Sequence, residues 1–580
     1  MSHRIVSLLK KPTVRADQGD ETTRRLCAAA YHDRRFRHTV LAKVFADTQH
    51  RVAPAYGFDL VPVVDHAWRA YCLDAAQNLC VLAILIITAA YRPDTALTTV
   101  CVLTLWSLSG CAGRLAPKVA EAKARAAVGR LLRSRKAQDA ASTRDMKEKV
   151  RRLKLSGGGC VVLLTVPAVA AGAAQTPFHL TVVRSVIPLA LIVVSTAFIA
   201  AERQWSIVMT QSPGRLRPRR PNERLRIIDH QQDHTIVVYR RPKRAPRRSS
   251  STLFDISELD EKPSFFVGSG QLVHRWLPPL AIQLLRPRQD HPGQNGSRDI
   301  TRREHVTPPF QAHELVDHLR KMMRPIGHLA DPIRLPGYRI AHRVYVEESD
   351  LPSVRGKLDG PCDAEFLREV IDDPDHPCQH FLEMRVTSSG ELVTTVFLRV
   401  TVKGRALSLD FATCALTRPP REFKQRARAR SSPVALLRGA LGALGNLPAE
   451  TARCWRGIFV LPALCHYGFI CARPYRHSGA TRFSIREKEA ASWAEAVFDE
   501  PTILDQMKIL ELRLLQATED FLRARNIDTS TFEKRAETIV SANVLNMGGR
   551  VDINNSAVGP NAQVNQNGNT PQPAAQGAEQ

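Results

Sequence analysis

Two long apolar stretches in the first third of the chain constrain its fold more than any other feature. The first runs from Cys72 to Gly113 and the second from Ser156 to Ala201. As a single helix each would be about 60 Å long or more, at least twice the hydrocarbon thickness of a bilayer. Proline and polar residues interrupt each stretch near its middle, which suits a turn at the bilayer surface. The sequence therefore predicts four transmembrane helices in two hairpins, at 73–91, 95–113, 156–174 and 183–202.

The distribution of basic residues predicts the orientation of these spans. There are 14 Lys and Arg against 4 Asp and Glu between Arg114 and Leu155, and 13 against 3 between Arg203 and Arg248. Basic loops stay in the cytoplasm, so we expect a multi-pass protein of the cell membrane with both termini and the 114–155 loop in the cytoplasm. This loop reads as a basic helical segment. Its charges either contact anionic lipid headgroups or only fix the topology.

The spans favour anchoring over transport. The segments 95–113 and 156–174 contain no Asp, Glu, Lys, Arg or His, whereas transporters usually keep such costly residues inside the bilayer. Small side chains in the third span permit close helix packing, including packing between subunits. A mean hydropathy of −0.20 excludes a chain that is membrane throughout. The Arg- and Pro-rich segment 203–250 has no interleaved aromatic residues, so we interpret it as a linker rather than a nucleic-acid-binding element.

Beyond residue 250 the pattern changes to mixed helix and strand. The sequence predicts a helix over 310–323, a strand over 338–346, and an antiparallel meander of three strands at 380–387, 391–402 and 405–416. Together these elements predict a cytosolic α+β domain at 251–425. The motif FFVGSG at 265–270 has no Lys-Ser/Thr after its glycines, so we expect a structural turn and not a phosphate-binding loop.

Two groups of polar residues are candidates for a site. The first group consists of Cys362, His376, Cys378 and His380. Their side chains could bind zinc, but only one pair is closely spaced along the chain, so a polar loop is the preferred interpretation. The second is interpreted as a solvated loop: Asp229, His230, Asp233 and His234. Scattered cysteines without a CxxC pair indicate a reducing compartment. Because no catalytic motif is present, we assign no catalytic, cofactor-binding or metal-binding residue and no cofactor.

The C-terminal region predicts helices and then a tail. Apolar spacing over 501–545 predicts two helices with a break near residue 528, which either pair as a hairpin or dock onto the domain. The apolar run 457–472 is too short for a comfortable span, so an interfacial, re-entrant or core segment is expected. The Asn- and Gln-rich tail 546–580 predicts disorder. Within it, residues 557–564 loosely resemble short amyloid-type signalling motifs, although Pro560 interrupts a continuous strand.

The chain as a whole resembles a known group of proteins. Two predicted hairpins, FFVGSG, the meander HFLEMRVTSSGELVTTVFLRVTVKGRALSLDF and the later stretch FLRARNIDTSTFEKRAETIVSANVLNMGG are similar to uncharacterised multi-pass membrane proteins of actinobacteria. The similarity covers most of residues 50–565. It implies a membrane protein with a cytosolic α+β domain and an Asn- and Gly-rich tail, and it implies no site residues.

The sequence therefore predicts a membrane α-helical protein with four transmembrane helices in two hairpins and a cytosolic α+β domain. The favoured function is a non-enzymatic scaffold or sensor that assembles through its helices, as a homo-oligomer or with a cytosolic protein partner. The alternatives are a small transporter or channel with a regulatory domain, or a membrane-anchored enzyme using the 337–417 region. The predicted segments are 1–72, 73–113, 114–155, 156–202, 203–250, 251–425, 426–500, 501–545 and 546–580.

Overall fold

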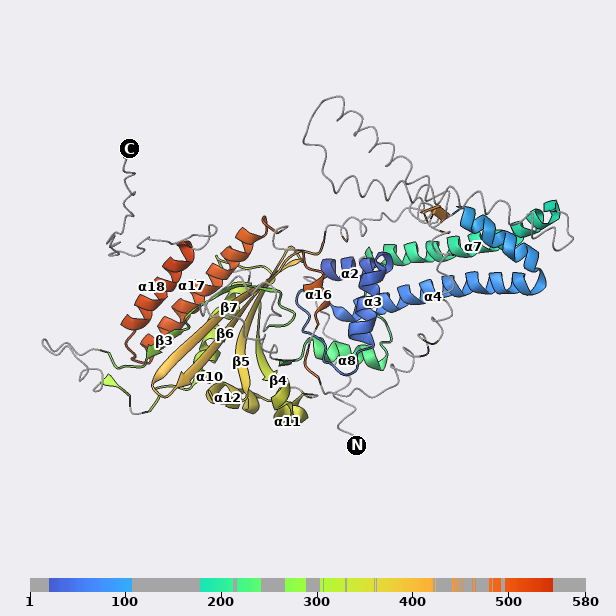
Figure 1. Cartoon of the computed structure of the whole chain (residues 1–580). Helices are drawn as coiled ribbons and strands as arrows, with labels where there is room; N and C mark the ends of the chain where they lie inside the picture. The colour runs from blue at the N-terminus through green and yellow to red at the C-terminus, as the bar shows by residue number, and fades with distance from the viewer. Residues whose placement is uncertain are drawn as a thin grey trace, which may run out of the picture.

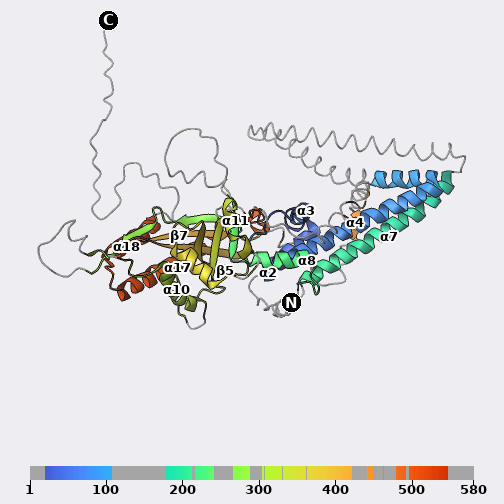
Figure 2. The ribbon, with the colours of Figure 1, turned by 90° about the horizontal axis from the view of Figure 1, so that it is seen from below.

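The described part of the chain forms an α+β domain and a long helical arm. The computed structural model describes residues 20–106, 178–211, 216–240, 266–287, 303–328, 331–420, 479–491 and 496–545, apart from single positions inside these ranges, together with a few isolated residues. The arm projects from one end of the domain, and the C-terminal helices lie at the other end (Figure 1). The same arrangement is seen from below in Figure 2.

The α+β domain is built on one mixed sheet of seven strands in the described residues. The strand order is β1-β4-β5-β6-β7-β2, and β3 also pairs with β7. Only β1 and β4 run parallel; the other pairs are antiparallel. The predicted meander is confirmed as β5, β6 and β7. The strands are β1 (Ile236–Tyr239), β2 (Gln271–Arg275), β3 (Leu280–Gln283), β4 (Arg339–Glu347), β5 (Cys378–Ser388), β6 (Leu392–Lys403) and β7 (Ala406–Leu416).

Helices cover one face of the sheet. They are α10 (Ala312–Met323), α12 (Ala364–Asp372), α17 (Glu500–Ala524) and α18 (Ser530–Leu545). Buried α17 side chains such as Leu510 and Leu514 share one core with β-strand residues such as Leu382 and Val396. The predicted helices at 310–323 and 501–545 are therefore confirmed, and α17 docks onto the domain. The short helices are η5 (Arg324–Gly327), η6 (Glu348–Asp350), α11 (Leu351–Val354), η7 (Arg355–Lys357) and α16 (Ile485–Lys488).

The helical arm combines a compact base with two long helices. Its elements are α2 (Asp20–His32), α3 (Arg34–Val40), η2 (Leu41–Phe45), α4 (Leu60–Tyr91), α7 (Phe178–Gln211) and α8 (Glu223–Gln232). The base buries the start of α4 against η2 and α8, with Val63, Val64 and Ile228 in one apolar cluster. Arg224 on α8 donates to the carbonyls of Val44, Phe45 and Asp47. These bonds supply donors for backbone carbonyls at the C-terminal end of η2, which have no partner within the helix.

Two of the described helices are long and apolar enough to cross a membrane, at Leu60–Tyr91 and Val182–Gln211. They contain the predicted spans 73–91 and 183–202. The predicted span 95–113 is described only to residue 106, and the helix there begins at residue 93, directly after the predicted turn at Arg92. The predicted span 156–174 lies outside the described residues. Among the described helices, therefore, two and not four are candidate membrane spans.

Several boundaries differ from the sequence prediction. The helix containing the first span begins at Leu60 and not at residue 73, because its first turns are buried in the base of the arm. The segment 203–250, interpreted as a linker, instead contains the end of α7, α8 and β1. Asn222 caps α8, and Leu225 and Ile228 bury its apolar side. The domain also continues past residue 425, because its core includes α17 and Phe532 of α18.

Of the remaining predicted segments, one is described by the structure and the others lie outside the described residues. The motif at 265–270 is confirmed as a turn where it is described, since Ser269 donates its amide to the carbonyl of Phe266. A Cβ on Gly270 would lie 2.1 Å from the carbonyl oxygen of Ala415, so the neighbouring strand requires glycine there. The basic loop 114–155, the tail 546–580 and, apart from Pro462 and Cys465, the run 457–472 lie outside the described residues.

Candidate functional site

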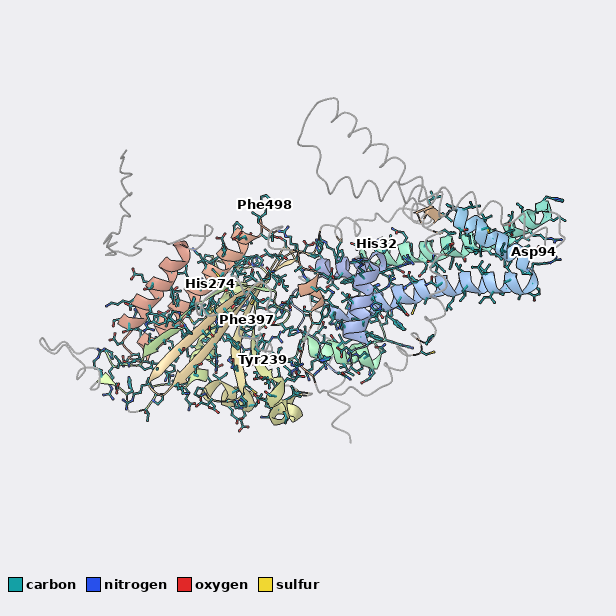
Figure 3. The ribbon with its side chains drawn as sticks, in the orientation of Figure 1. His32, Asp94, Tyr239, His274, Phe397 and Phe498 are labelled. Atoms are coloured by element: carbon teal, nitrogen blue, oxygen red, sulfur yellow. The ribbon has the colours of Figure 1, made fainter. Side chains whose placement is uncertain are left out.

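The loop that precedes α4 places a tyrosine on the face of the sheet that α10 and α17 do not cover. Tyr56 is fully buried and packs with Phe381 and Phe397, on the sheet face opposite α10 and α17. Phe266 stacks on Phe397 with ring centroids 4.0 Å apart, which closes this aromatic cluster. Figure 3 shows Phe397 and Tyr239 on the sheet near the base of the arm. The segment leading directly into α4 is thus part of the domain core.

Tyr56 joins a buried ion pair on the same face. Its hydroxyl donates to Glu383 Oε2 at 3.0 Å, and Arg343 Nε donates to the same oxygen at 2.6 Å. Arg343 Nη1 also donates to the carbonyl of His234 at 2.6 Å. The second cation, Arg385, lies over the Tyr56 ring and reaches the carbonyl of Ala55. We call Tyr56, Arg343, Glu383 and Arg385 the junction cluster.

The junction cluster is charged although it is buried. Burial by itself would raise the pKa of Glu383, but the guanidinium groups of Arg343 and Arg385 outweigh it and hold that pKa below the ordinary value. Burial, and next the Glu383 carboxylate, raises the pKa of Tyr56. Glu383 is therefore an anion, and Tyr56 remains its hydrogen-bond donor. The ion pair joins β4 to β5 within the sheet, and the Tyr56 hydroxyl ties the arm to it. Separation of the arm would leave the buried Glu383 carboxylate without that donor, so the cluster resists it.

A second set of polar contacts ties helix α2 to the same sheet. Arg25 forms an ion pair with Glu391 at the turn between β5 and β6, and the Thr22 hydroxyl donates to the Gly390 carbonyl at 2.6 Å. Arg486 of α16 is 1 % exposed and donates to the carbonyls of Glu391 and Thr417. Burial, and next the charge of Arg25, lowers the pKa of Arg486 to about 10. The base of the arm is thus held to the sheet at two separate points.

The structure places Cys362 and Cys378 in one apolar cluster, but it does not gather all four predicted residues of the first set into one site. Cys378 packs in an apolar cluster with residues of β1 and β4, while Nδ1 of His376 accepts the amide of Cys378. His380 Nε2 instead lies 3.0 Å from Nδ1 of His342. Burial, and next His342, lowers the pKa of His380 to about 3. Among the described residues no group of three or more potential ligands could hold a metal ion.

The second set, at the end of α8, is only partly solvated: His230 and Asp233 are exposed, whereas Asp229 and His234 make structural contacts. His234 is 7 % exposed; its Nδ1 accepts the amide of Ile236, and its Nε2 lies 3.0 Å from the carbonyl of Gly360. Asp229 pairs with Arg217 and accepts from Gln232. His234 therefore orients the chain at the start of β1. Sequence reasoning identified these residues as a cluster, but it missed the junction cluster, in which Tyr56 lies 287 to 329 residues before the other members.

A shallow groove lies away from all these residues. It has a volume of about 460 Å³ and runs between α17 and α18, with Leu515, Phe532 and Val540 among its lining residues. The enzyme alternative requires a pocket beside His376 and Cys378, and neither residue lines this groove. The groove therefore gives no support to an enzyme of the 337–417 region.

Comparison with known proteins identifies the sheet region and its C-terminal helices. No curated protein and no solved structure matches the chain. A family model described as AbeC-like domain matches residues 279–554, which is somewhat less than half of the chain. The match begins next to β3 and includes α17 and α18, so it agrees with the domain core better than the predicted boundary at residue 425. Residues 279–554 are therefore similar to the AbeC-like domain, and the helical arm is joined to this part of the chain through the junction cluster.

Proposed function

We propose that this chain is an integral protein of the cytoplasmic membrane that serves as a non-enzymatic scaffold or sensor. Its arm anchors the AbeC-like domain at the cytoplasmic face, where the domain meets its protein partners. The main observation behind this proposal is that the two ends of α4 lie in different environments. Its first turns are buried in the base of the arm beside the junction cluster, and its last turns expose large apolar side chains such as Ile86, Ile87 and Tyr91.

Exposed apolar surface supports membrane insertion. In the most apolar windows of the two long helices, only 17 % and 28 % of the residues are buried. A core helix of a soluble protein would bury most of such a window, because a large exposed apolar patch is costly in water. Seven side chains in the first half of α7 are exposed in the same way: Leu180, Val182, Val183, Val186, Ile187, Leu191 and Val194. A bilayer is the solvent that suits this surface.

The junction cluster supports a mechanical link between arm and domain. Tyr56 lies only four residues before the start of α4, and it is bonded to Glu383 in the middle of the sheet. A tilt or shift of α4 relative to the sheet would have to break buried polar contacts, which are costly to leave unmade. The arm and the domain should therefore move as one body. That property suits a sensor that reports a membrane event, or a scaffold that holds the domain at a set distance.

Insertion and topology can be tested in membranes of expressing cells. The proposal predicts that the chain stays in the pellet at alkaline pH and leaves it only with detergent. An epitope inserted after Arg92 should be accessible on intact cells, and an epitope at the N-terminus only after permeabilisation. Release by alkaline buffer would overturn membrane insertion. An accessible N-terminus on intact cells would overturn the orientation.

Assembly is the second part of the proposal. We propose that the chain self-associates through its helices, and the native mass in mild detergent tests this. Full-length protein should form a defined oligomer. A chain ending at Val544, which keeps nearly all of α18, separates the two sources of assembly. If the shorter chain is smaller, the tail drives association; if both are equal oligomers, the helices do. If both are monomers, self-assembly is refuted, and the domain should be tested for a heterologous partner.

A further inference from the structure

The groove between α17 and α18 combines apolar side chains with two carboxylates. Leu515 and Phe532 line it from the domain core, where both are buried. Leu512 also lines it, and this leucine is 51 % exposed. Glu519 and Glu537 are the acidic residues of the lining. A half-exposed leucine beside a hollow gains from a segment that covers it, because apolar surface is costly in water.

The chain that follows α18 starts beside this groove. The two helices pack against each other at the end of the domain far from the arm (Figure 1). The last residue of α18 is Leu545, and Val540, five residues earlier, lines the groove. The segment 546–554, with the sequence NMGGRVDIN, comes next and lies outside the described residues. A segment tethered this close meets the groove at a high effective concentration.

The family match extends beyond the last described helix. It ends at residue 554, nine residues after Leu545. The segment 546–554 is therefore matched together with the sheet and its helices, whereas its composition alone assigned it to the tail. So short a segment cannot form a core of its own, so it needs a surface of the domain to pack on. The groove beside α18 offers such a surface.

The residues of this segment suit the groove. Gly548 and Gly549 permit the left-handed backbone that commonly ends a helix and reverses the chain. After them, Val551 and Ile553 are two positions apart, so an extended backbone directs both side chains to the same side. Arg550 directly precedes them and supplies a guanidinium, which pairs well with carboxylates. The segment thus has two apolar side chains for the apolar lining and a cation for the acidic one.

The reach of the segment also matches the groove. An extended backbone covers about 3.3 Å per residue, so the four residues after the glycine pair span about 13 Å. Along α18, at about 1.5 Å per residue, Val540 lies about 7.5 Å and Ala536 about 13.5 Å before the end of the helix. A chain that reverses at the glycines therefore brings Val551 to the level of Val540. It brings Ile553 to the level of Ala536, which also lines the groove.

We propose that residues 550–554 dock in the groove between α17 and α18 of their own chain. Val551 and Ile553 cover Leu512 and the apolar lining, and Arg550 pairs with the carboxylates beside them. The tether favours this occupant over a second copy, because the segment starts at the groove and loses little freedom on docking. Docking fixes the start of the Asn- and Gln-rich tail, so the amyloid-type segment 557–564 leaves the domain from a set point. The inference does not depend on membrane insertion.

Disulfide trapping in full-length protein tests the docking. Leu512→Cys combined with Val551→Cys should cross-link under mild oxidation, because docking holds the two Cβ atoms within the range of a disulfide. Leu512→Cys combined with Val558→Cys is the matched control, since its second cysteine lies on the same tail beyond the docked segment. The first pair should form at least about tenfold more disulfide than the control pair, as measured by mass spectrometry of the linked peptides. Equal yields for the two pairs would overturn the proposal.

Two further readouts of the same experiment identify the cause and the occupant. Ile553→Asp, added to the first pair, places a charge against the apolar lining and should reduce the disulfide yield to that of the control pair. An unchanged yield would show that apolar docking does not hold the segment, which contradicts the proposal. The linked peptides should come from one chain, so the cross-linked protein should migrate as a monomer in a denaturing gel without reductant. A cross-linked dimer would assign the groove to the tail of a second copy and would overturn docking within the chain.

Discussion

Replacement of Glu383 by glutamine tests the junction cluster most directly. Glutamine keeps the size and one acceptor oxygen of glutamate, but it removes the charge that neutralises Arg343 and Arg385. The Glu383 side chain is 2 % exposed and that of Arg343 is 6 % exposed, so the Arg343 guanidinium cannot be rehydrated without opening the structure around it. Breaking a buried ion pair costs about 3–5 kcal/mol. For a unit of roughly 250 residues this corresponds to a Tm lower by about 6–20 °C.

The measurement is thermal unfolding of full-length protein in detergent, with Tyr56→Phe as the matched control. That variant removes the hydroxyl that donates to Glu383 but leaves the ion pair intact. Loss of one hydrogen bond to a charged group costs about 1.5–3 kcal/mol, so its effect should be smaller. If Glu383→Gln costs no more than Tyr56→Phe, the Glu383 carboxylate does not stabilise the buried Arg343 guanidinium, and the role given to the ion pair is refuted.

The same variant also makes a prediction about acid stability. The pKa of Glu383 is lower in the folded chain than its ordinary value of 4.5. Its stabilising contribution is therefore complete above pH 4.5 and is lost as the pH falls through the folded value. Wild-type protein should lose this contribution below pH 4.5, and Glu383→Gln should have none to lose. Parallel acid profiles for the two proteins would show that Glu383 is not ionised in the folded state.

Three further tests, two of them with a control substitution, address other parts of the fold. Gly270→Ala should prevent stable folding, because its Cβ would clash with the Ala415 carbonyl, and the yield of folded protein checks this. In Gly404→Ala the Cβ meets no atom within 4 Å, so this control should cost only about 1 kcal/mol of backbone strain, measured by denaturant titration. Phe532→Ala should cost about 3–5 kcal/mol because Phe532 is fully buried, whereas Phe498→Ala should be nearly neutral because Phe498 is 91 % exposed and points away from the domain (Figure 3). The pKa of His380 is about 3 in the folded chain against 6.5 ordinarily, so the stability of the wild-type protein should fall as the pH drops below 6.5. His380→Gln should reduce the change in Tm between pH 7 and pH 5. An unchanged pH dependence of Tm would argue against a buried neutral imidazole.

Elements whose signal is local were predicted well from the sequence. The meander has alternating strands joined by short turns, and α10 and α17 have regular helical apolar spacing, so neighbouring residues are enough to specify them. The break between α17 and α18 at Asn526 was also visible, and the residue has a positive φ of 54°. The two apolar helices belong to the same class, since their length and hydropathy do not depend on their partners.

Elements that depend on distant partners were missed. The strand β1 pairs with β4, about 100 residues later, and its surroundings are rich in arginine and proline, so composition indicated a linker. The buried start of α4 was likewise not separable from the apolar run that follows. The possible zinc site was not found for a similar reason. Cys378 and His380 lie beside different neighbours in the folded chain, and the spacing of ligands along the sequence does not reveal those neighbours.

The sequence by itself determined the classes of structure: apolar helices long enough for a membrane, a β-meander, and amphipathic helices after it. These follow from periodicity and hydropathy, which are properties of short segments. Only the tertiary structure decided how the charged residues are used. Glu383, Arg343 and Asp74 look like ordinary surface charges in the sequence, yet each is largely buried and ion-paired. A charge becomes a structural element only where folding removes water and supplies a partner, and that depends on residues far away in the chain.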